Sequence, residues 1–279
     1  MYEVKGAAQS ERTNDMQFTI LSDEGLPIRG DLDIPPGAKA LVVIVHGFKG
    51  FKDWGFFPWL AETLGNHRFA VCRFNMSRNG IAENPETFDR LDLFADDTYS
   101  GQIADLHKVV RYAQQRIDAP TFLAGHSRGG GVALLAADGI QNLCGIVTWS
   151  AIARTDRWDD ATKKLWRRAG YLEAENTRTK QMMRMSTRML DDIEANRERL
   201  DILKCATQIE QPILVIHGAR DESVPLAESA EIESYAGDAS RVVIANASHS
   251  YNAIHPLVNI PFELTMAAAL TARFVSVYS

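Results

Sequence analysis

Short apolar runs recur along the chain, and polar or amphipathic stretches separate them. The run Ala40–Val45 is apolar at every position, which is typical of a parallel strand whose two faces are both covered. Five similar runs follow it: Phe69–Phe74, Phe122–Ala124, Gly145–Trp149, Ile213–Ile216 and Val242–Ile244. Two further strands, Gln17–Ile20 and Pro27–Ile34, flank a turn that contains Gly25. The pattern therefore predicts eight strands.

Helix-like stretches lie between most of these runs. They cover Phe57–Leu64, Phe94–Ile117, Gly130–Ala137 and Pro261–Val275. Alternating strands and helices favour parallel pairing, because a parallel connection has to cross over the face of the sheet. We therefore expect an α/β fold with a mostly parallel, doubly wound, eight-stranded sheet that is flanked by helices.

One segment interrupts the alternation. Residues 154–210 contain no strand-like run, are helical in composition, and carry nearly equal numbers of basic and acidic residues. A crossover needs only about a dozen residues, so this excess predicts an inserted helical cap. Residues 1–153 and 211–279 would then form the main domain, with the cap as part of one structural unit. Ordinary crossover helices of unusual length are the alternative.

The composition excludes several classes of partner. The chain has 279 residues and a formal net charge of −6, without the basic blocks that nucleic-acid binding requires. No apolar run reaches the ~18 residues of a membrane span, and Met1–Asp15 lacks the apolar core of a secretory signal. Three scattered cysteines, Cys72, Cys144 and Cys205, predict free thiols in a reducing compartment. We expect a cytoplasmic protein with no membrane or nucleic-acid partner, and the sequence leaves homo-oligomerisation open.

A turn of small residues follows the predicted strand that ends at residue 124. Its sequence, Gly125-His126-Ser127-Arg128-Gly129, matches the Gly-x-Ser-x-Gly pattern of a nucleophile elbow. Such a turn holds the serine in a strained conformation, and the glycines remove clashes that larger residues would cause. The helix that follows directs free N–H groups toward a developing oxyanion. Ser127 is therefore the candidate nucleophile, and an ordinary glycine-rich strand-to-helix turn is the alternative.

A serine nucleophile needs a histidine base. Three histidines follow Ser127 in the chain: His217, His249 and His255. His249 lies in a loop of small residues just after a predicted strand, where parallel sheets bind ligands, and it is the candidate base. His217 ends a strand and is expected to pack in the core or bond the backbone, whereas His255 lies near the final helix.

The base in turn needs an acid that orients it, and enzymes with a nucleophile elbow place this acid between the serine and the histidine. Asp221, in the turn after Gly218, occupies that position and is the candidate acid. Its neighbour Glu222 is expected to point elsewhere, and Asp156 is a reserve candidate. A turn-capping role is the alternative for Asp221.

The oxyanion of acyl transfer needs two backbone N–H donors. One is expected from Arg128, which directly follows the nucleophile. The other is expected from the loop His46–Gly50 after the first buried strand, where Phe48 is the candidate. A simple strand-ending turn is the alternative for this loop.

These segments together resemble the α/β-hydrolase superfamily, from about residue 18 to the end of the chain. The resemblance rests on His46–Gly50, Gly125–Gly130, His217-Gly218 with Asp221, and His249. The His-Gly-Phe loop with Asp53-Trp54 is also similar to small serine esterases of the cinnamoyl/feruloyl esterase and dienelactone-hydrolase-like type, and to prolyl-oligopeptidase-like catalytic domains. Dienelactone hydrolases usually carry a cysteine nucleophile, and here the chain departs from them with a serine.

The residues and the resemblance together imply a serine carboxylester hydrolase with a Ser127–His249–Asp221 triad. It would act through an acyl-enzyme on small to medium acyl or aryl esters, so its partner is a small-molecule ester substrate. A peptide or amide hydrolase, a thioesterase or an acyltransferase with the same triad is the alternative. A non-catalytic relative that binds a small molecule is a further alternative from another class of protein.

Substrate-pocket candidates are aromatic residues and methionines. They are Trp54, Trp149, Trp166, Met185 and Tyr251. Core packing is the alternative for each of them. No cluster with metal-ligand spacing and no phosphate-binding glycine pattern is present, so we expect neither a metal nor another cofactor.

Overall fold

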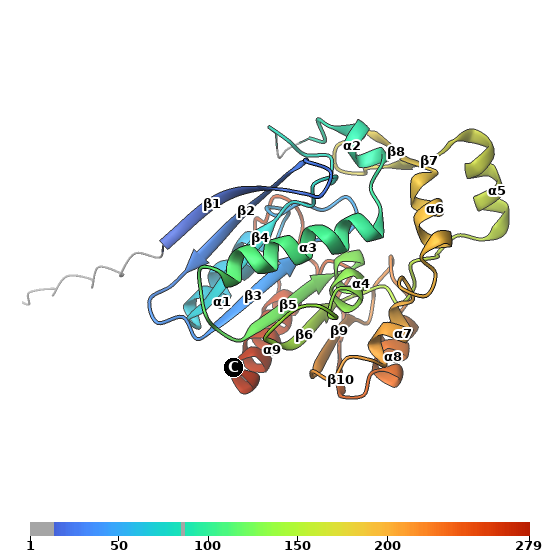
Figure 1. The fold of residues 1–279 in the computed structure, drawn as a ribbon. Helices are drawn as coiled ribbons and strands as arrows, with labels where there is room; N and C mark the ends of the chain where they lie inside the picture. The colour runs from blue at the N-terminus through green and yellow to red at the C-terminus, as the bar shows by residue number, and fades with distance from the viewer. Residues whose placement is uncertain (1–13, 85–86) are drawn as a thin grey trace, which may run out of the picture.

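The computed structural model describes residues 14–84 and 87–279 (Figure 1). Most of the N-terminal segment in which no secretory signal is expected therefore lies outside the described residues. The main sheet has eight strands in the order β1-β2-β4-β3-β5-β6-β9-β10. These are β1 Asn14–Leu21, β2 Pro27–Ile34, β3 Ala40–Val45, β4 Phe69–Phe74, β5 Thr121–His126, β6 Leu143–Trp149, β9 Ile213–Gly218 and β10 Ala239–Ile244. All pairs are parallel except those that β2 forms with β1 and β4, so the predicted sheet is confirmed.

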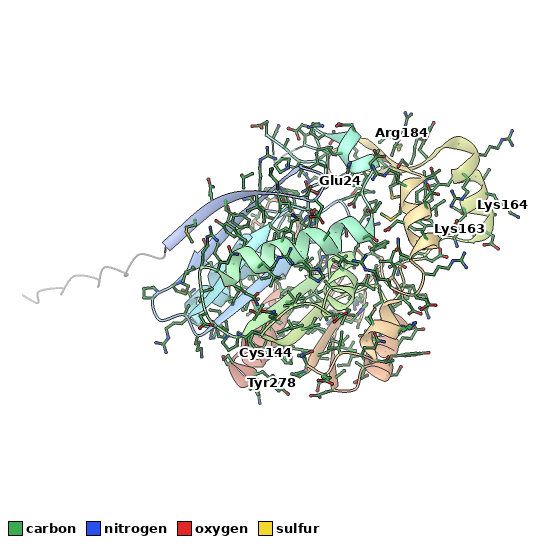
Figure 2. All side chains as sticks on the ribbon, viewed as in Figure 1. Glu24, Cys144, Lys163, Lys164, Arg184 and Tyr278 are labelled. Atoms are coloured by element: carbon green, nitrogen blue, oxygen red, sulfur yellow. The ribbon has the colours of Figure 1, made fainter. Side chains whose placement is uncertain are left out.

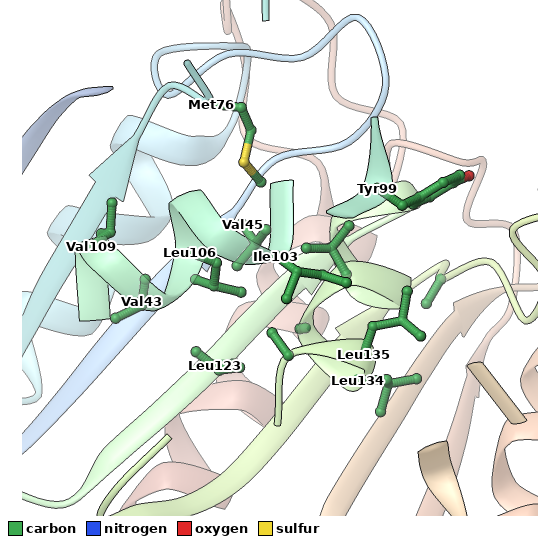
Figure 3. Packing of buried hydrophobic residues seen from close by; sticks show 14 of the residues in the cluster. Val43, Val45, Met76, Tyr99, Ile103, Leu106, Val109, Leu123, Leu134 and Leu135 are labelled. Carbon is green, nitrogen blue, oxygen red and sulfur yellow. The ribbon is translucent and has the colours of Figure 1, made fainter. Parts of the chain in front are cut away.

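Alternate side chains of the central strands enter two hydrophobic cores, one on each face of the sheet. Leu41, Val43 and Val45 of β3 belong to the core beneath helices α3 (Tyr99–Gln114) and α4 (Arg128–Leu135). Figure 3 shows Ile103 and Leu106 of α3 packed over this face.

The intervening residues of β3, Ala40, Val42 and Ile44, enter the opposite core with α1 (Phe57–Asn66) and α9 (Phe262–Tyr278). Helix α8 (Leu226–Tyr235) connects β9 to β10. Because successive side chains of a strand point to opposite faces, burial on both faces requires the uninterrupted apolar runs of the sequence.

The prediction of one long helix over Phe94–Ile117 is wrong in one respect, because the helix is interrupted near its start. It forms a short helix α2 (Leu91–Ala95) and then α3, with residues 96–98 between them. Thr98 caps α3 by accepting a hydrogen bond from the Gly101 N–H, which favours a new helix start over continuation. The break leaves Asp97 buried beside the loop that follows β3, a placement used below.

Residues 154–210 connect β6 to β9 and project beyond one end of the sheet (Figure 1). They contain α5 (Asp160–Ala169), β7 (Tyr171–Glu175), β8 (Met182–Ser186), α6 (Arg188–Ala195) and α7 (Ile202–Ala206). The expectation of an all-helical segment is wrong for the antiparallel pair β7–β8. Its alternation is carried by charged residues and methionines, which are weak strand formers, so the strand pattern was not recognised.

The structure shows where the charged residues and the cysteines lie. Charged side chains such as Lys164 and Arg184 cover the outer side of residues 154–210 (Figure 2). All three cysteines are free; Cys72 is buried, whereas Cys144 and Cys205 are partly exposed. Among the described residues, no helix is both long enough and apolar enough to cross a membrane.

Candidate active site

Ser127 occupies the sharp turn between the end of β5 and the start of α4. Its backbone has φ 57° and ψ −122°, a conformation that non-glycine residues rarely adopt. The Ser127 N–H donates to the Trp149 carbonyl at 2.8 Å, and the Ser127 carbonyl accepts from the Gly130 N–H at 3.0 Å. Such strain costs on the order of 1–3 kcal/mol and persists only where surrounding structure enforces it, which these bonds to β6 and α4 do here.

Two glycines allow the elbow and the loop after β3 to approach each other. A Cβ on Gly129 would collide with the Val45 carbonyl oxygen, so β3 and α4 can meet only with glycine at this position. A Cβ on Gly47 would lie 2.9 Å from Ser127 Cβ and 3.4 Å from Ser127 Oγ. The loop after β3 therefore lies directly against the serine hydroxyl.

His249 lies in the loop after β10, and its ring faces the carboxylate of Asp221 from the loop after β9. His249 Nδ1 is 2.9 Å from Asp221 Oδ2 and 3.0 Å from Oδ1. Burial would raise the pKa of Asp221, but hydrogen bonds from His217 and His249 outweigh it and hold that pKa well below its usual range. An ionised carboxylate only accepts hydrogen bonds, so Nδ1 carries the proton of a neutral His249 and Nε2 is its free lone pair.

The carboxylate of Asp221 has further donors. The N–H groups of Ser223 and Val224 donate to Oδ1 at 2.8 and 2.9 Å. His217, fully buried on β9, places Nε2 3.2 Å from Asp221 Oδ2 and 3.0 Å from the Val224 carbonyl. His217 thus packs in the core and bonds the backbone as expected, and it also contacts the candidate acid, which the sequence did not indicate.

His126 supports the loop that carries His249. Its Nε2 donates to the His249 carbonyl at 2.9 Å, and the two rings lie 4.8 Å apart. Burial lowers the pKa of His126 to about 3, so the ring is neutral at working pH. Sequence reasoning placed His126 in the elbow motif but assigned it no function; its position beside Ser127 was the available signal.

His46 fixes the loop that contains Phe48. The Met76 N–H donates to His46 Nε2 at 3.2 Å, so Nδ1 carries the proton and donates to the Gly47 carbonyl at 2.9 Å. Burial lowers the pKa of His46 to about 4 and keeps the ring neutral. The loop therefore has a defined conformation at the position where Phe48 adjoins the elbow.

A cavity of about 450 Å³ opens beside the elbow, and both Ser127 and His249 line it. One wall is aromatic and contains Phe48, Trp54 and Phe57. Another part of the lining is polar and comes from residues 175–178, at the end of β7 and in the turn that precedes β8. Sequence reasoning missed this turn because the β7–β8 pair was not recognised.

Three other contributions to the cavity also went unrecognised. Lys49 donates through Nζ to the Glu175 carbonyl at 2.6 Å, which joins the loop after β3 to the β7–β8 turn. Glu222 was expected to point elsewhere, but it lines the cavity and accepts from the His249 N–H at 3.3 Å. His255 also lines the cavity and stacks on Trp54. Its Nδ1 accepts a hydrogen bond from the Gly55 N–H.

Of the five expected pocket residues, only Trp54 belongs to the described lining of this cavity. The other four are corrections, because their side chains are buried elsewhere in the protein. Trp149 Nε1 donates to Thr271 beneath the sheet, and the Tyr251 hydroxyl donates to the Ile216 carbonyl. Trp166 Nε1 donates to the Met185 carbonyl inside residues 154–210, where both side chains are buried. Large aromatic residues fill cores more often than pockets.

The remaining candidates have simple placements. Asp156, the reserve acid, pairs with Lys163 and is about half exposed, whereas Asp221 contacts His249. Arg128 begins α4 directly after Ser127, and Phe48 lines the cavity. Among residues 14–84 and 87–279, no group of three or more potential metal ligands of the His, Cys, Asp or Glu type is found.

Residues 36–200 match the family model described as serine aminopeptidase, S33. This match covers more than half of the chain. The chain belongs to this family. It is therefore a member of the α/β-hydrolase superfamily, as the motif resemblance implied.

Solved structures of low sequence identity share the fold. Est1E from Butyrivibrio proteoclasticus has a TM-score of 0.70 and 20% identity, over 94% of this chain and 98% of that one. A second structure of Est1E contains bound ferulic acid. Dienelactone hydrolase from Anabaena variabilis ATCC 29413 has a TM-score of 0.63 and 17% identity, over 95% of this chain and 98% of that one. A comparison with curated protein sequences finds no significant match.

Proposed function

We propose that this α/β-hydrolase is a serine carboxylester hydrolase with Ser127 as nucleophile, His249 as base and Asp221 as orienting acid. One observation carries the proposal. Ser127, at a strained elbow, and His249 line the same cavity, while His249 Nδ1 bonds a buried, ionised Asp221. This arrangement leaves His249 Nε2 unprotonated for the serine hydroxyl, as a general base requires.

In the proposed reaction, His249 Nε2 takes the hydroxyl proton of Ser127 while Oγ attacks the ester carbonyl. The N–H groups of Phe48 and Arg128 stabilise the oxyanion, together with the N-terminus of α4. The imidazolium, stabilised by Asp221, then protonates the leaving alcohol, and an acyl-enzyme remains. Water activated by His249 attacks the acyl carbonyl and releases the acid and the free serine.

Small to medium acyl or aryl esters suit the cavity. Its volume of about 450 Å³ lies in the range of small-molecule sites, and its wall of Phe48, Trp54 and Phe57 fits an apolar acyl or aryl group. The related fold of Est1E holds ferulic acid, an aromatic acid. Residues 154–210 would serve as a cap, because their β7–β8 turn supplies part of the cavity lining. The free thiols support the expected cytoplasmic location.

Amide hydrolysis is the second candidate, because the matching family model is described as a serine aminopeptidase. The same triad attacks esters and amides, and an amide makes greater demands on protonation of the leaving group. Comparing a p-nitrophenyl ester with the p-nitroanilide of the same acid decides between them. Anilide turnover that is lost in Ser127→Ala would assign a peptidase, whereas ester turnover without anilide turnover would assign an esterase.

The decisive experiment measures hydrolysis of p-nitrophenyl acetate, butyrate and octanoate by the wild type and by Ser127→Ala. We expect turnover by the wild type and a fall in kcat of about 10⁴-fold or more in the variant. Labelling with a fluorophosphonate probe is expected for the wild type and absent in Ser127→Ala. Turnover that survives the substitution would mean that another residue is the nucleophile.

A further inference from the structure

The side chain of Arg128 turns away from the cavity and into the protein. Arg128 directly follows the nucleophile, yet its side chain is only 7% exposed. Its guanidinium carbon lies 4.1 Å from the ring centroid of Phe48 and 5.1 Å from that of Tyr99. The cation therefore lies between the loop after β3 and the first turn of α3.

A buried carboxyl group, that of Asp97, lies beside the guanidinium of Arg128. Arg128 Nη1 lies 3.6 Å from Asp97 Oδ2, within ion-pair range but without a hydrogen bond, and the Gln102 side-chain amide donates a hydrogen bond to the same carboxyl group. Burial raises the pKa of Asp97 to about 7, aided by nearby Asp105, while Arg128 and Gln102 favour the anion. A buried ion pair adds little net stability, because the cost of desolvating both groups offsets most of their attraction.

The Arg128–Phe48 contact joins the two segments that supply the proposed oxyanion donors. Phe48 belongs to the loop after β3, whereas Arg128 belongs to the elbow. Phe48 also contacts Phe94 of α2 at 5.4 Å between ring centroids, so its ring is held on a second side. A fixed ring restrains the backbone of Phe48, and small misplacements of oxyanion donors are costly in rate.

We propose that Arg128 is a positioning residue for the oxyanion hole, in which its guanidinium, anchored by Asp97 and Tyr99, holds Phe48 and so aligns both N–H donors on Ser127. This inference rests on the proposed function. It assigns Arg128 a role through its side chain in addition to the backbone role expected of any residue in its position. Since backbone donors survive substitution, the side-chain role can be tested separately.

The test compares Arg128→Met and Arg128→Lys with the wild type on p-nitrophenyl butyrate. Arg90→Met is the matched control, because it removes an exposed ion pair between Arg90 and Asp92 at the start of α2. We expect Arg128→Met to lower kcat by about 10- to 100-fold with KM within twofold. Arg128→Lys should restore part of kcat, and the control should match the wild type.

Two further measurements separate positioning from a purely structural role. Affinity for phenylboronic acid, which forms a tetrahedral adduct with a serine nucleophile, should fall in Arg128→Met by the same factor as kcat. In a double-mutant cycle, Phe48→Ala, which retains the backbone N–H, should lower kcat to a similar degree. Adding Arg128→Met to Phe48→Ala should then lower it little further.

A folded Arg128→Met with wild-type kcat and boronate affinity would overturn the inference, as would fully additive effects in the cycle. If Arg128→Met does not fold, Asp97→Asn and Phe48→Ala decide, and normal kcat in both would overturn it. Failure of the proposed function is a distinct result, because the wild type would then neither hydrolyse esters nor react with the fluorophosphonate probe.

Discussion

The Nδ1 atom of His249 lies 2.9 Å from Oδ2 of Asp221, although 28 residues separate them in the chain. Parallel pairing of β9 and β10 brings the loops that follow these strands together at one edge of the sheet. The contact fixes which nitrogen of His249 bears the proton. It therefore leaves Nε2 as the nitrogen with which His249, the proposed base, would accept a proton, and it is the first relationship to test.

Asp221→Asn should lower kcat by about 10³- to 10⁴-fold, because an amide no longer holds the required tautomer of His249. Glu222→Gln is the matched control, since Glu222 also faces His249 but bonds only its backbone N–H, at 3.3 Å. We expect the control to lose less than tenfold. Equal losses in steady-state assays of the two variants would remove Asp221 from the proposed triad.

Gly47→Ala should lower kcat by about 100-fold or more, because the added Cβ would lie 2.9 Å from Ser127 Cβ and displace the loop after β3, which carries the proposed donor Phe48. Gly65→Ala, near the end of α1, adds the same methyl group into open space. That control should retain activity and gain about 0.5–1 kcal/mol in the free energy of unfolding. Kinetics and urea unfolding measure both effects, and an active Gly47→Ala would contradict the loop's placement.

His126→Leu should lower kcat more than His126→Gln does. The His126 Nε2–H holds the His249 carbonyl at 2.9 Å, and glutamine can retain a donor there whereas leucine cannot. We also expect leucine to reduce the free energy of unfolding by about 0.5–1.5 kcal/mol, because a partly buried hydrogen bond is lost. Kinetics and urea titrations of both variants test this, and indistinguishable variants would show that the hydrogen bond is unimportant.

Acid should destabilise the protein partly through His46. Its pKa is lowered from 6.5 to about 4, so the unfolded state binds more protons than the folded state between these values. The stability that the neutral, buried His46 contributes is fully present above pH 6.5 and is lost as the pH falls toward 4. From pH 7 to pH 4.5, His46→Gln should therefore lose less stability than the wild type, by about 2–3 kcal/mol.

Urea unfolding at the two pH values measures this difference, and His67→Gln is its control because His67 is exposed. The control should keep the wild-type pH dependence. If His46→Gln kept it as well, protonation of His46 would not contribute to acid unfolding.

Lys49→Met should loosen the β7–β8 turn, because Lys49 Nζ donates to the Glu175 carbonyl at 2.6 Å inside the cavity. Lys180→Met is the matched control, since Lys180 pairs only with the exposed carboxylate of the same glutamate, at 3.6 Å. Hydrogen exchange of residues 171–186 should accelerate in Lys49→Met and stay unchanged in the control. Unchanged exchange in both would show that the loop after β3 does not restrain this turn.

Much of the fold could be predicted because its central strands are buried on both faces and so require unbroken apolar runs. Predictions failed where local patterns were weak or interrupted. The helix expected over Phe94–Ile117 breaks where Thr98 caps a new start, and β7–β8 alternates charged residues with methionines. The Thr98 cap interrupts the helical period. The alternation of β7 and β8 spans only five residues in each strand and includes only one β-branched or aromatic residue, so it is a weak strand signal.

By itself, the sequence determined where the eight strands of the main sheet occur along the chain, the elbow at Ser127, and the candidate roles of His249 and Asp221. These depend on local turns and on chain order. Only the tertiary structure decided that His217 and Glu222 flank this pair, that Arg128 packs on Phe48, and which residues line the cavity. Such contacts join segments that are distant in the chain. They depend on the register of the strands and on the placement of residues 154–210, and no local sequence pattern encodes either.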